Sequence, residues 1–319
     1  MRAGGAREPR ARAAGPARRA GTQSRTVRRR RAILALTLAT AAVLVTVLLN
    51  VGGGHRHGHH ARASASAPGR GTGSRGGTAS AGSGGQDAES NQVRALIALG
   101  KPIYCAARRG NEVALTFDDG PGPYTRLVLA KLRKHGVRAT FFDVARNIPL
   151  LPGATRQELA IGGVGDHTFT HPLLTGLAPA QADGEIANAQ AALERSSGGP
   201  VFLFRPPYGG RNEAIDAIAR AHGLLQILWT VDSADSLGAD YAQIERTVIA
   251  GLHGGAIILM HENHGQTVRA LLGIFAALAR LHVRPVSVAQ LLSDDPPSAA
   301  QVRAGGRGCG AGVKHITGD

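Results

Sequence analysis

The sequence predicts an α/β fold in which parallel strands alternate with helices, as in a (β/α) barrel. Two observations indicate this fold. Short apolar runs alternate with amphipathic segments between residues 93 and 293, and polar side chains follow the apolar runs in a regular phase. Such an alternation requires crossover connections, and therefore a parallel sheet with buried faces. The 319 residues suffice for one large domain or two small ones with a substantial core.

The predicted elements follow from the spacing of apolar residues. Apolar runs predict strands at residues 113–117, 140–144, 162–168, 201–204, 224–231, 256–260 and 284–288. Amphipathic segments predict helices at residues 125–135, 179–195, 212–222, 241–252 and 267–281. In the first helix Leu127, Leu129 and Leu132 are available for packing, and in the second Ile186 and Leu193 are expected to face the core.

The formal net charge of +15 comes mainly from the N-terminal residues. Residues 1–31 contain eleven arginines and one glutamate, whereas residues 93–319 contain 22 Lys and Arg against 19 Asp and Glu. A DNA-binding domain carries its positive charge on the fold itself. The distribution therefore argues against a nucleic-acid-binding function.

Residues 1–31 are expected to form a basic cytoplasmic tail and residues 32–51 a transmembrane anchor. As a helix, the uncharged stretch 32–49 spans about 27 Å, close to the thickness of a hydrocarbon core. The arginines before it place the N-terminus inside and the rest of the chain outside. A cleavable signal peptide is the alternative, although its apolar region is usually about 7 to 15 residues long. A twin-arginine export signal also fits the arginines.

Residues 52–92 are rich in Gly, Ser, Ala and His and are predicted to be a flexible linker. Residues 93–293 then form the predicted folded domain, and residues 294–319 a C-terminal tail. The two cysteines, Cys105 and Cys309, lie near the two ends of this domain. In an exported protein they can form a disulfide that ties the two ends together, and two unpaired thiols are the alternative.

Polar residues lie at the carboxyl ends of the predicted strands. They are Asp118 and Asp119 after the first strand, His167 and His171 after the third, Arg205 after the fourth, Asp232 and Asp235 after the fifth, and His261 after the sixth. In a (β/α) barrel these ends converge on the face where active sites are built. The phase of the polar residues therefore predicts one composite site.

The residue types at this site suit metal-assisted hydrolysis. Two histidines four residues apart, His167 and His171, together with one carboxylate can bind zinc and leave a coordination position open. The β-branched residues between them and Pro172 allow a shaped loop as well as a helix. Adjacent aspartates at a strand end point in different directions, so one can face a metal while the other accepts a proton from water.

Four segments resemble, in order, the motifs of the polysaccharide deacetylase (NodB homology) family, carbohydrate esterase family 4. The segments are residues 116–121 (TFDDGP), 167–172 (HTFTHP), 205–209 (RPPYG) and 259–261 (LMH). The resemblance covers residues 110–293. It implies a distorted (β/α) barrel of about seven strands, the NodB homology fold. It also implies a divalent metal, usually zinc, and removal of N-acetyl or O-acetyl groups from polysaccharides.

The resemblance also implies roles for individual residues. The metal ligands are Asp119, His167 and His171, and Asp118 is the general base. Arg205 holds Asp118 ionised.

On the substrate side, the resemblance implies that the backbone N–H of Tyr208 stabilises the oxyanion, with Pro207 and Leu259 lining the substrate pocket. His261 protonates the leaving amine, and Asp235 orients this histidine.

The chain departs from the family pattern at two places. Ser236 follows Asp235, where the family usually has Trp, so one wall of the groove beside His261 is missing or is supplied by another residue such as Trp229. The residues before His167, Ile161-Gly162-Gly163, replace the Gly-His-Glu-like approach of the family.

The function expected from these observations is that of a membrane-tethered, extracytoplasmic, metal-dependent deacetylase of an envelope polysaccharide such as peptidoglycan, acting as a monomer on N-acetyl groups. Its expected partners are the acetylated polysaccharide and, through the N-terminal helix, the membrane. One alternative is a glycan-binding homologue with impaired catalysis. Another is an iron oxygenase built on two histidines and one carboxylate, which leaves Asp118 and His261 without roles.

Overall fold

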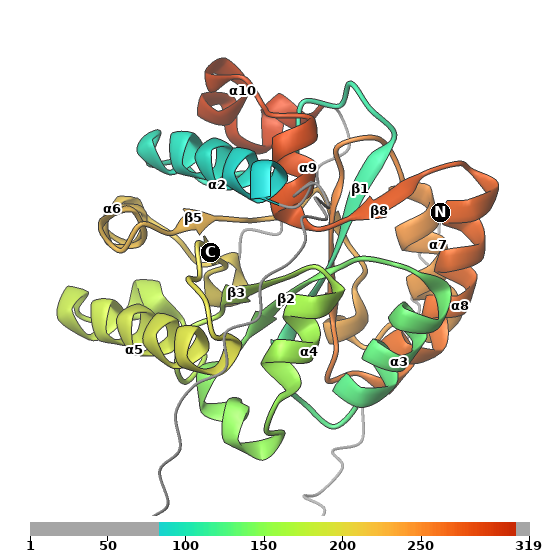
Figure 1. The fold of residues 1–319 in the computed structure, drawn as a ribbon, viewed down its shortest axis with the longest axis horizontal. Helices are drawn as coiled ribbons and strands as arrows, with labels where there is room; N and C mark the ends of the chain where they lie inside the picture. Colours follow the sequence, from blue (N-terminus) through green and yellow to red (C-terminus); the bar gives the residue numbers. More distant parts are fainter. Residues whose placement is uncertain (1–82, 311–319) are drawn as a thin grey trace, which may run out of the picture. The chain divides into compact units, whose positions relative to one another are not determined.

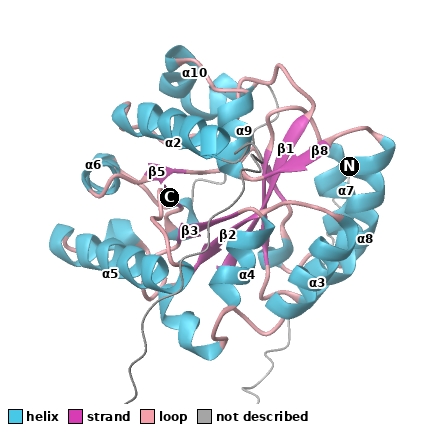
Figure 2. Cartoon of the chain, viewed as in Figure 1, coloured by secondary structure: helices cyan, strands magenta, loops and turns pink. Residues whose placement is uncertain are grey.

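A computed structural model describes residues 83–310 and contains an eight-stranded sheet surrounded by helices (Figure 1). The strands are β1 (Glu112–Gly120), β2 (Thr140–Asp143), β3 (Gly163–Asp166), β4 (Leu203–Phe204), β5 (Leu225–Gln226), β6 (Val231–Asp232), β7 (Ile257–His261) and β8 (Arg284–Val286). The main helices are α2 (Ser83–Ala98), α3 (Thr125–His135), α4 (Ala154–Ile161), α5 (Pro179–Ser197), α6 (Glu213–Ala221), α7 (Tyr241–Ala250), α8 (Gly265–Arg280), α9 (Val288–Asp294) and α10 (Ala299–Ala304). Strands and helices alternate along most of the chain (Figure 2), as the sequence predicts.

All strand pairs in the sheet are parallel, and the order is β5-β4-β3-β2-β1-β7-β6, with β8 pairing to the first half of β1. The segment from β5 to β6 links the two edges. Its Leu225 N–H donates to Phe202 O at 2.7 Å beside β4, and its Thr230 N–H donates to Ile257 O at 2.9 Å beside β7. The sheet therefore curves into a distorted barrel.

The prediction of one continuous strand at residues 224–231 is wrong, because this segment is divided into β5 and β6. The segment changes partner strand between its two ends. In its middle, the carbonyl oxygens of Ile227 and Leu228 accept hydrogen bonds from the Arg205 side chain. The division of the strand is thus part of how the fold holds a buried arginine.

Helices α3, α7 and α8 cover one face of the sheet. In α3, Val128, Leu129 and Leu132 are buried in the core, and Gly136 ends the helix with φ 63°. The prediction that Leu127 packs in the core is wrong, because its side chain is 53% exposed. The apolar stripe of α3 is displaced by one residue, to Val128, so Leu127 points outward.

Folded structure extends beyond the predicted domain limits at both ends. Helix α2 begins at Ser83, inside the predicted linker, and its Val93 and Leu96 are buried in a cluster that also contains residues of α9. At the other end, α10 and Cys309 lie inside the predicted tail, and Val302 of α10 is buried. In Figure 1, α2, α9 and α10 lie together. These helices are short or weakly amphipathic, so their apolar spacing gave little indication of them.

Cys105 and Cys309 are joined by a disulfide across 204 residues of chain. The bond connects the segment before β1 to the segment after α10. It therefore links the two ends of the folded domain, and the alternative of two unpaired thiols does not hold in the structure.

In the part of the chain that the structure describes, no helix has the length and apolarity needed to cross a bilayer. The predicted basic tail, the predicted anchor at residues 32–51 and the linker up to residue 82 lie outside the described residues.

Removing the disulfide is expected to destabilise the domain strongly. In the chain-entropy model, closing a loop of 204 residues stabilises the folded state by roughly 5 kcal/mol. The double variant Cys105→Ser/Cys309→Ser should therefore show a much lower urea midpoint than the oxidised wild type. Reductant should lower the midpoint of the wild type and leave that of the variant unchanged. Equal midpoints for both proteins without reductant would contradict the expectation.

Candidate active site

The candidate active site lies at the carboxyl end of β1, between β2 and β7. Asp118 pairs in register with Phe142 of β2 and with His261 of β7. The loop that follows β3 carries His167 and His171. Because the neighbouring strands are parallel, their carboxyl ends bring these side chains to one edge of the sheet.

Three side chains offer their ligand atoms to one point. His171 Nε2 lies 3.2 Å from Asp119 Oδ1, His167 Nε2 lies 3.7 Å from the same oxygen, and the two ring nitrogens are 3.2 Å apart. Ligands at about 2.1 Å around a tetrahedral zinc ion are roughly 3.4 Å apart. The donor set of two imidazoles and one carboxylate, at these separations, fits a divalent cation.

The tautomer of His167 leaves Nε2 free for a cation. Its Nδ1 lies 2.7 Å from the carbonyl oxygen of Arg205, and because a carbonyl only accepts, Nδ1 carries the proton. Burial, followed by the charge of His171, lowers the pKa of His167 to about 3. The ring is therefore neutral, with its lone pair on Nε2.

The segment between the two histidines is a shaped loop and not a helix. Thr168 and His171 have φ values of 70° and 65°, which lie in the left-handed region. Asp166 Oδ1 accepts from the Thr168 N–H at 2.6 Å, and Thr168 Oγ1 accepts from the His171 N–H at 3.0 Å. These hydrogen bonds fold the loop so that both imidazoles face Asp119.

Two asparagines hold Asp119, whose φ is 68°. Asn263 Nδ2 donates to Asp119 Oδ2 at 3.2 Å, and Asn147 Nδ2 donates to the backbone oxygen of Asp119 at 3.3 Å. The bond from Asn263 occupies Oδ2 and leaves Oδ1 toward the histidines. Neither asparagine was predicted from the sequence, although Asn263 stands only two residues after His261.

Asp118 and Arg205 form a fully buried ion pair. Arg205 Nη1 donates to Asp118 Oδ1 at 2.6 Å and to Thr116 Oγ1 at 2.8 Å, and Arg205 Nε donates to Ile227 O at 3.0 Å. Burial raises the pKa of Asp118, and the charge of Arg205 opposes that rise. The pair thus favours the ionised carboxylate, whose free oxygen Oδ2 lies 3.6 Å from His167 Nε2.

Aromatic rings enclose the guanidinium of Arg205. Its Cζ lies 4.1 Å from the ring centroid of Phe142 and 5.6 Å from that of Trp229. The Trp229 ring also lies against Gly209, where a Cβ would come within 3.0 Å of it. Trp229 therefore covers the arginine and the loop after β4. At the position where the family usually has Trp, this chain has Ser236, and the side chain of the next residue, Leu237, is 70% exposed.

His261 and Asp235 form a second hydrogen-bonded pair. His261 Nδ1 donates to Asp235 Oδ1 at 2.7 Å, and Asp235 Oδ2 accepts from the His261 N–H at 2.7 Å and from Thr267 Oγ1 at 2.5 Å. Burial opposes the charged form of His261, but the hydrogen bond and charge of Asp235 outweigh it and raise the pKa to about 9. The histidine is therefore protonated at neutral pH, with Nε2 as the outer donor. The hydrogen bond from Thr267 to Asp235 was not predicted from the sequence.

Tyr208 lies at the rim, on the short turn Pro207–Gly209. Its φ is 60°, its side chain is 66% exposed, and its ring centroid lies 4.8 Å from that of His171. Pro207, the first residue of this turn, is buried, and Leu259 is buried on β7 two residues before His261. Their predicted contacts with an acyl group stay predictions.

Three further carboxyl groups, of Asp143, Glu158 and Glu262, are buried beside the site. Each offers an oxygen, and these oxygens lie within 4.8 Å of one another. Glu262 follows His261 directly, and its Oε1 occupies the space of a Cβ at Gly120, at 1.6 Å. Burial, followed by mutual repulsion, raises the pKa of Glu158 and of Glu262 well above the usual range. Burial also raises the pKa of Asp143. The cluster therefore retains protons at pH values where exposed carboxyl groups are ionised.

A family model described as "Polysaccharide deacetylase" matches residues 106–227. The chain is 33% identical over 204 residues to a chitooligosaccharide deacetylase of Bradyrhizobium, covering 56% of this chain and 92% of that protein. The chain belongs to the polysaccharide deacetylase family.

Two further proteins are similar to this chain. It is 36% identical over 172 residues to the peptidoglycan-N-acetylglucosamine deacetylase PgdA of Listeria monocytogenes, covering 53% of this chain. It spans only 36% of that protein's length. A family 4 carbohydrate esterase of Streptomyces lividans, solved with acetate, has a TM-score of 0.53 and 36% identity, covering 55% of this chain and 91% of that one.

The buried carboxyl cluster is expected to make stability depend on pH. Because the folded pKa values lie above the unfolded ones, the cluster costs no stability below about pH 4 and costs progressively more as the pH rises through the folded values. Glu158→Gln should therefore raise Tm by about 2–4 °C at pH 8, with a smaller gain at pH 5. Calorimetry at both pH values measures the difference.

The exposed Glu213→Gln provides the control, and its Tm should change little with pH. A Tm loss for Glu158→Gln that grows toward high pH would show that an ionised Glu158 is needed.

Proposed function

We propose that this protein is a metal-dependent deacetylase that hydrolyses N-acetyl groups of an envelope polysaccharide such as peptidoglycan. The single observation that carries the proposal is that two hydrogen-bonded pairs lie at one set of candidate metal ligands: one pair holds a carboxylate and the other a protonated histidine. An arginine-paired carboxylate, Asp118, lies beside Asp119, His167 and His171. A protonated histidine, His261, lies on the neighbouring strand in register with Asp118.

Asp119, His167 and His171 would hold the divalent cation, most consistent with zinc given the ligand types. When bound, the cation supplies Lewis acidity, which lowers the pKa of water and stabilises negative charge on the acetyl oxygen. Asp118 takes up the proton of the attacking water through Oδ2. Arg205 keeps Asp118 ionised through Oδ1 and fixes its orientation.

Tyr208 at the rim and His261 act on the two other groups that change charge in the reaction, the oxyanion and the leaving amine. The left-handed conformation of Tyr208 supports the proposal that its backbone N–H donates to the developing oxyanion. His261 then donates the proton on Nε2 to the departing amine nitrogen. Asp235, hydrogen-bonded to Nδ1, stabilises the protonated ring before this step.

The relatives support a polymeric amino-sugar substrate, since their names specify peptidoglycan N-acetylglucosamine and chitooligosaccharide. We further propose that the N-terminal residues anchor the protein in the membrane with the N-terminus inside and the catalytic domain outside. The disulfide between Cys105 and Cys309 supports an oxidising compartment. An envelope glycan is then the polymer within reach.

Acetate release from N-acetylated glycan oligomers tests the proposal. The wild type should release acetate, a chelator should abolish the release, and added Zn²⁺ should restore it. Asp118→Asn should lower kcat at least about 100-fold, because it removes the proton acceptor, while the variant still binds one metal ion per chain. Metal-dependent glycan binding without acetate release would favour the glycan-binding alternative. Iron-dependent oxidation would favour the oxygenase.

A second test concerns the proton donor. Asp235→Asn removes the charge that raises the pKa of His261 to about 9, so burial then dominates and lowers this pKa. Because the donor must be protonated, the alkaline limit of kcat/KM should move to lower pH, and the rate at pH 8 should fall about 10–100-fold. The pH–rate profile measures the shift. An unchanged alkaline limit would show that His261 does not set it.

A further inference from the structure

A recess lies between α3 and α4. It has a volume of about 310 Å³ and is lined by Arg126, Leu129, Arg133, Leu151, Pro152, Ala154 and Gln157. We call it the α3–α4 pocket. Arg126 and Arg133 are seven residues apart on α3, which places them about 10.5 Å apart along one side of the helix.

The stretch of chain that forms this pocket exposes only positive charge. Between residues 120 and 160, the exposed charged side chains are those of Arg126, Arg133, Lys134, Arg138, Arg146 and Arg156. The only acidic residues in this stretch, Asp143 and Glu158, are buried. The domain as a whole is nearly neutral, so the positive charge is concentrated here.

The two arginines of the pocket keep their charge available. Arg133 Nη2 donates to Gln157 Oε1 at 2.8 Å, which orients the guanidinium without neutralising it. Among the described residues, the arginines in ion pairs are Arg109, Arg205, Arg211 and Arg284, and none of them lines this pocket. An anion entering the pocket would therefore meet two unneutralised guanidinium groups.

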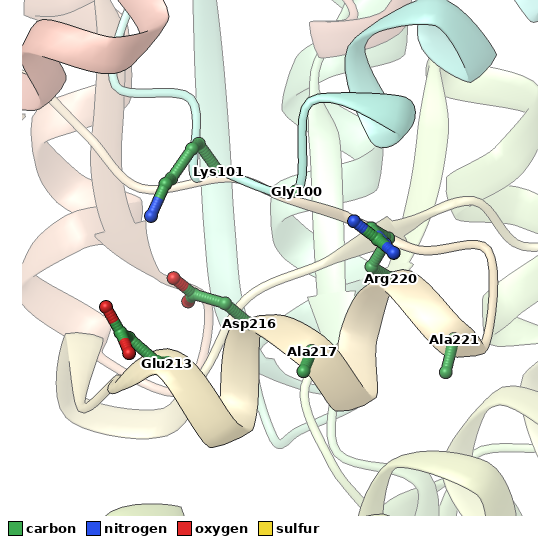
Figure 3. A pocket seen from close by; sticks show the side chains of 7 residues that line it. All are labelled: Gly100, Lys101, Glu213, Asp216, Ala217, Arg220 and Ala221. Carbon is green, nitrogen blue, oxygen red and sulfur yellow. The ribbon is translucent and has the colours of Figure 1, made fainter.

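A second pocket of the same volume shows the contrast. The α6 pocket, lined by Gly100, Lys101, Glu213, Asp216, Ala217, Arg220 and Ala221, also measures about 310 Å³ (Figure 3). Its two cations are balanced by two carboxylates, and Asp216 is further paired with Arg211 at 2.8 Å. Because the α6 pocket has the same volume but balanced charge, it serves as the control for the effect of charge in the α3–α4 pocket.

The α3–α4 pocket is formed by segments that follow residues of the candidate active site in the chain. Arg126 follows Asp119 by seven residues, which at about 3.3 Å per residue limits their separation to roughly 23 Å. The other wall follows the turn Ala145–Leu150, whose Asn147 donates to Asp119 O. The pocket is therefore close enough for a polysaccharide to contact it while an acetylated sugar lies at Asp118 and His261.

We propose that the α3–α4 pocket binds negatively charged groups of the polysaccharide that the active site deacetylates, so that the preferred substrate is an anionic glycan and not a neutral one. This inference rests on the proposed function. Carboxylate and phosphate groups share the chemistry that two arginines recognise. A recess of about 310 Å³ can take up a charged group of a polymer, whereas a membrane would contact the protruding side chains around it.

The test compares a neutral chitin oligomer with carboxymethylated and phosphorylated chitin oligomers of the same length. Binding is measured by calorimetry on metal-free protein, where turnover is blocked, and kinetics on the metal-loaded protein. For Arg126→Gln/Arg133→Gln we expect affinity for one or both anionic oligomers to fall about 5–20-fold, with KM rising in parallel. Affinity for the neutral oligomer should change less than about twofold. The wild-type preference should also weaken as salt increases.

The matched control is Lys101→Gln/Arg220→Gln in the α6 pocket, which removes the same number of charges and should leave all affinities unchanged. Equal losses in both double variants, or no preference of the wild type for either anionic oligomer, would overturn the proposal. The proposal would also be overturned if anionic lipid vesicles bound tightly through Arg126 and Arg133 while the neutral and anionic oligomers bound with equal affinity. Absence of acetate release from every oligomer would reject the proposed function alone, because the binding data do not require turnover.

Discussion

The buried ion pair between Arg205 and Asp118 is the interaction on which the rest of the site depends. A fully buried guanidinium is tolerated only when its charge is paired and its N–H groups have acceptors. Here Asp118 provides the charge, Thr116 a hydroxyl, and Ile227 and Leu228 two carbonyl oxygens. These carbonyls are available because the segment between β5 and β6 leaves the regular ladder. The backbone oxygen of Arg205 also fixes the tautomer of His167. One residue thereby orients both Asp118, the proposed proton acceptor, and His167, a candidate metal ligand.

Much of the unusual backbone of the domain is concentrated at this site. Of the seven described non-glycine residues with positive φ, five belong to site segments: Asp119, Thr168, His171, Tyr208 and Ala234. Each such conformation costs of order 1–3 kcal/mol and persists only where the surroundings enforce it. The hydrogen bond that Asn147 donates to Asp119 O and the one that Asp166 accepts from the Thr168 N–H are part of that enforcement. The folded barrel thus stabilises a local geometry that the isolated segments would not adopt.

The sequence predicted the alternation of strands and helices along the chain and the edge of the sheet where the polar residues meet, because alternation and phase are local properties. It did not predict contacts that depend on tertiary geometry. Thr267 and Asn263 are ordinary residues at the start of a helix and in a loop, and only the folded chain brings them to Asp235 and Asp119. The division of residues 224–231 has the same origin, since a change of partner strand leaves no mark on apolar spacing. The burial of Glu158 could not be predicted from the sequence either, because a glutamate on a short helix is usually exposed.

Gly120 connects the two halves of the site in a way that constrains how this enzyme scaffold can be altered. It follows the metal-ligand candidate Asp119, and its missing side chain leaves the space in which Glu262 sits. Glu262 in turn is adjacent to His261, and its N–H donates to Asp118 O at 3.2 Å. Even a single added methyl at this glycine would push on the strand that carries the acid and on the turn that carries the ligand at once. Library design for altered selectivity is therefore better directed at the outer walls than at Gly120, whose packing affects the candidate ligand Asp119 and the proposed proton donor His261 together.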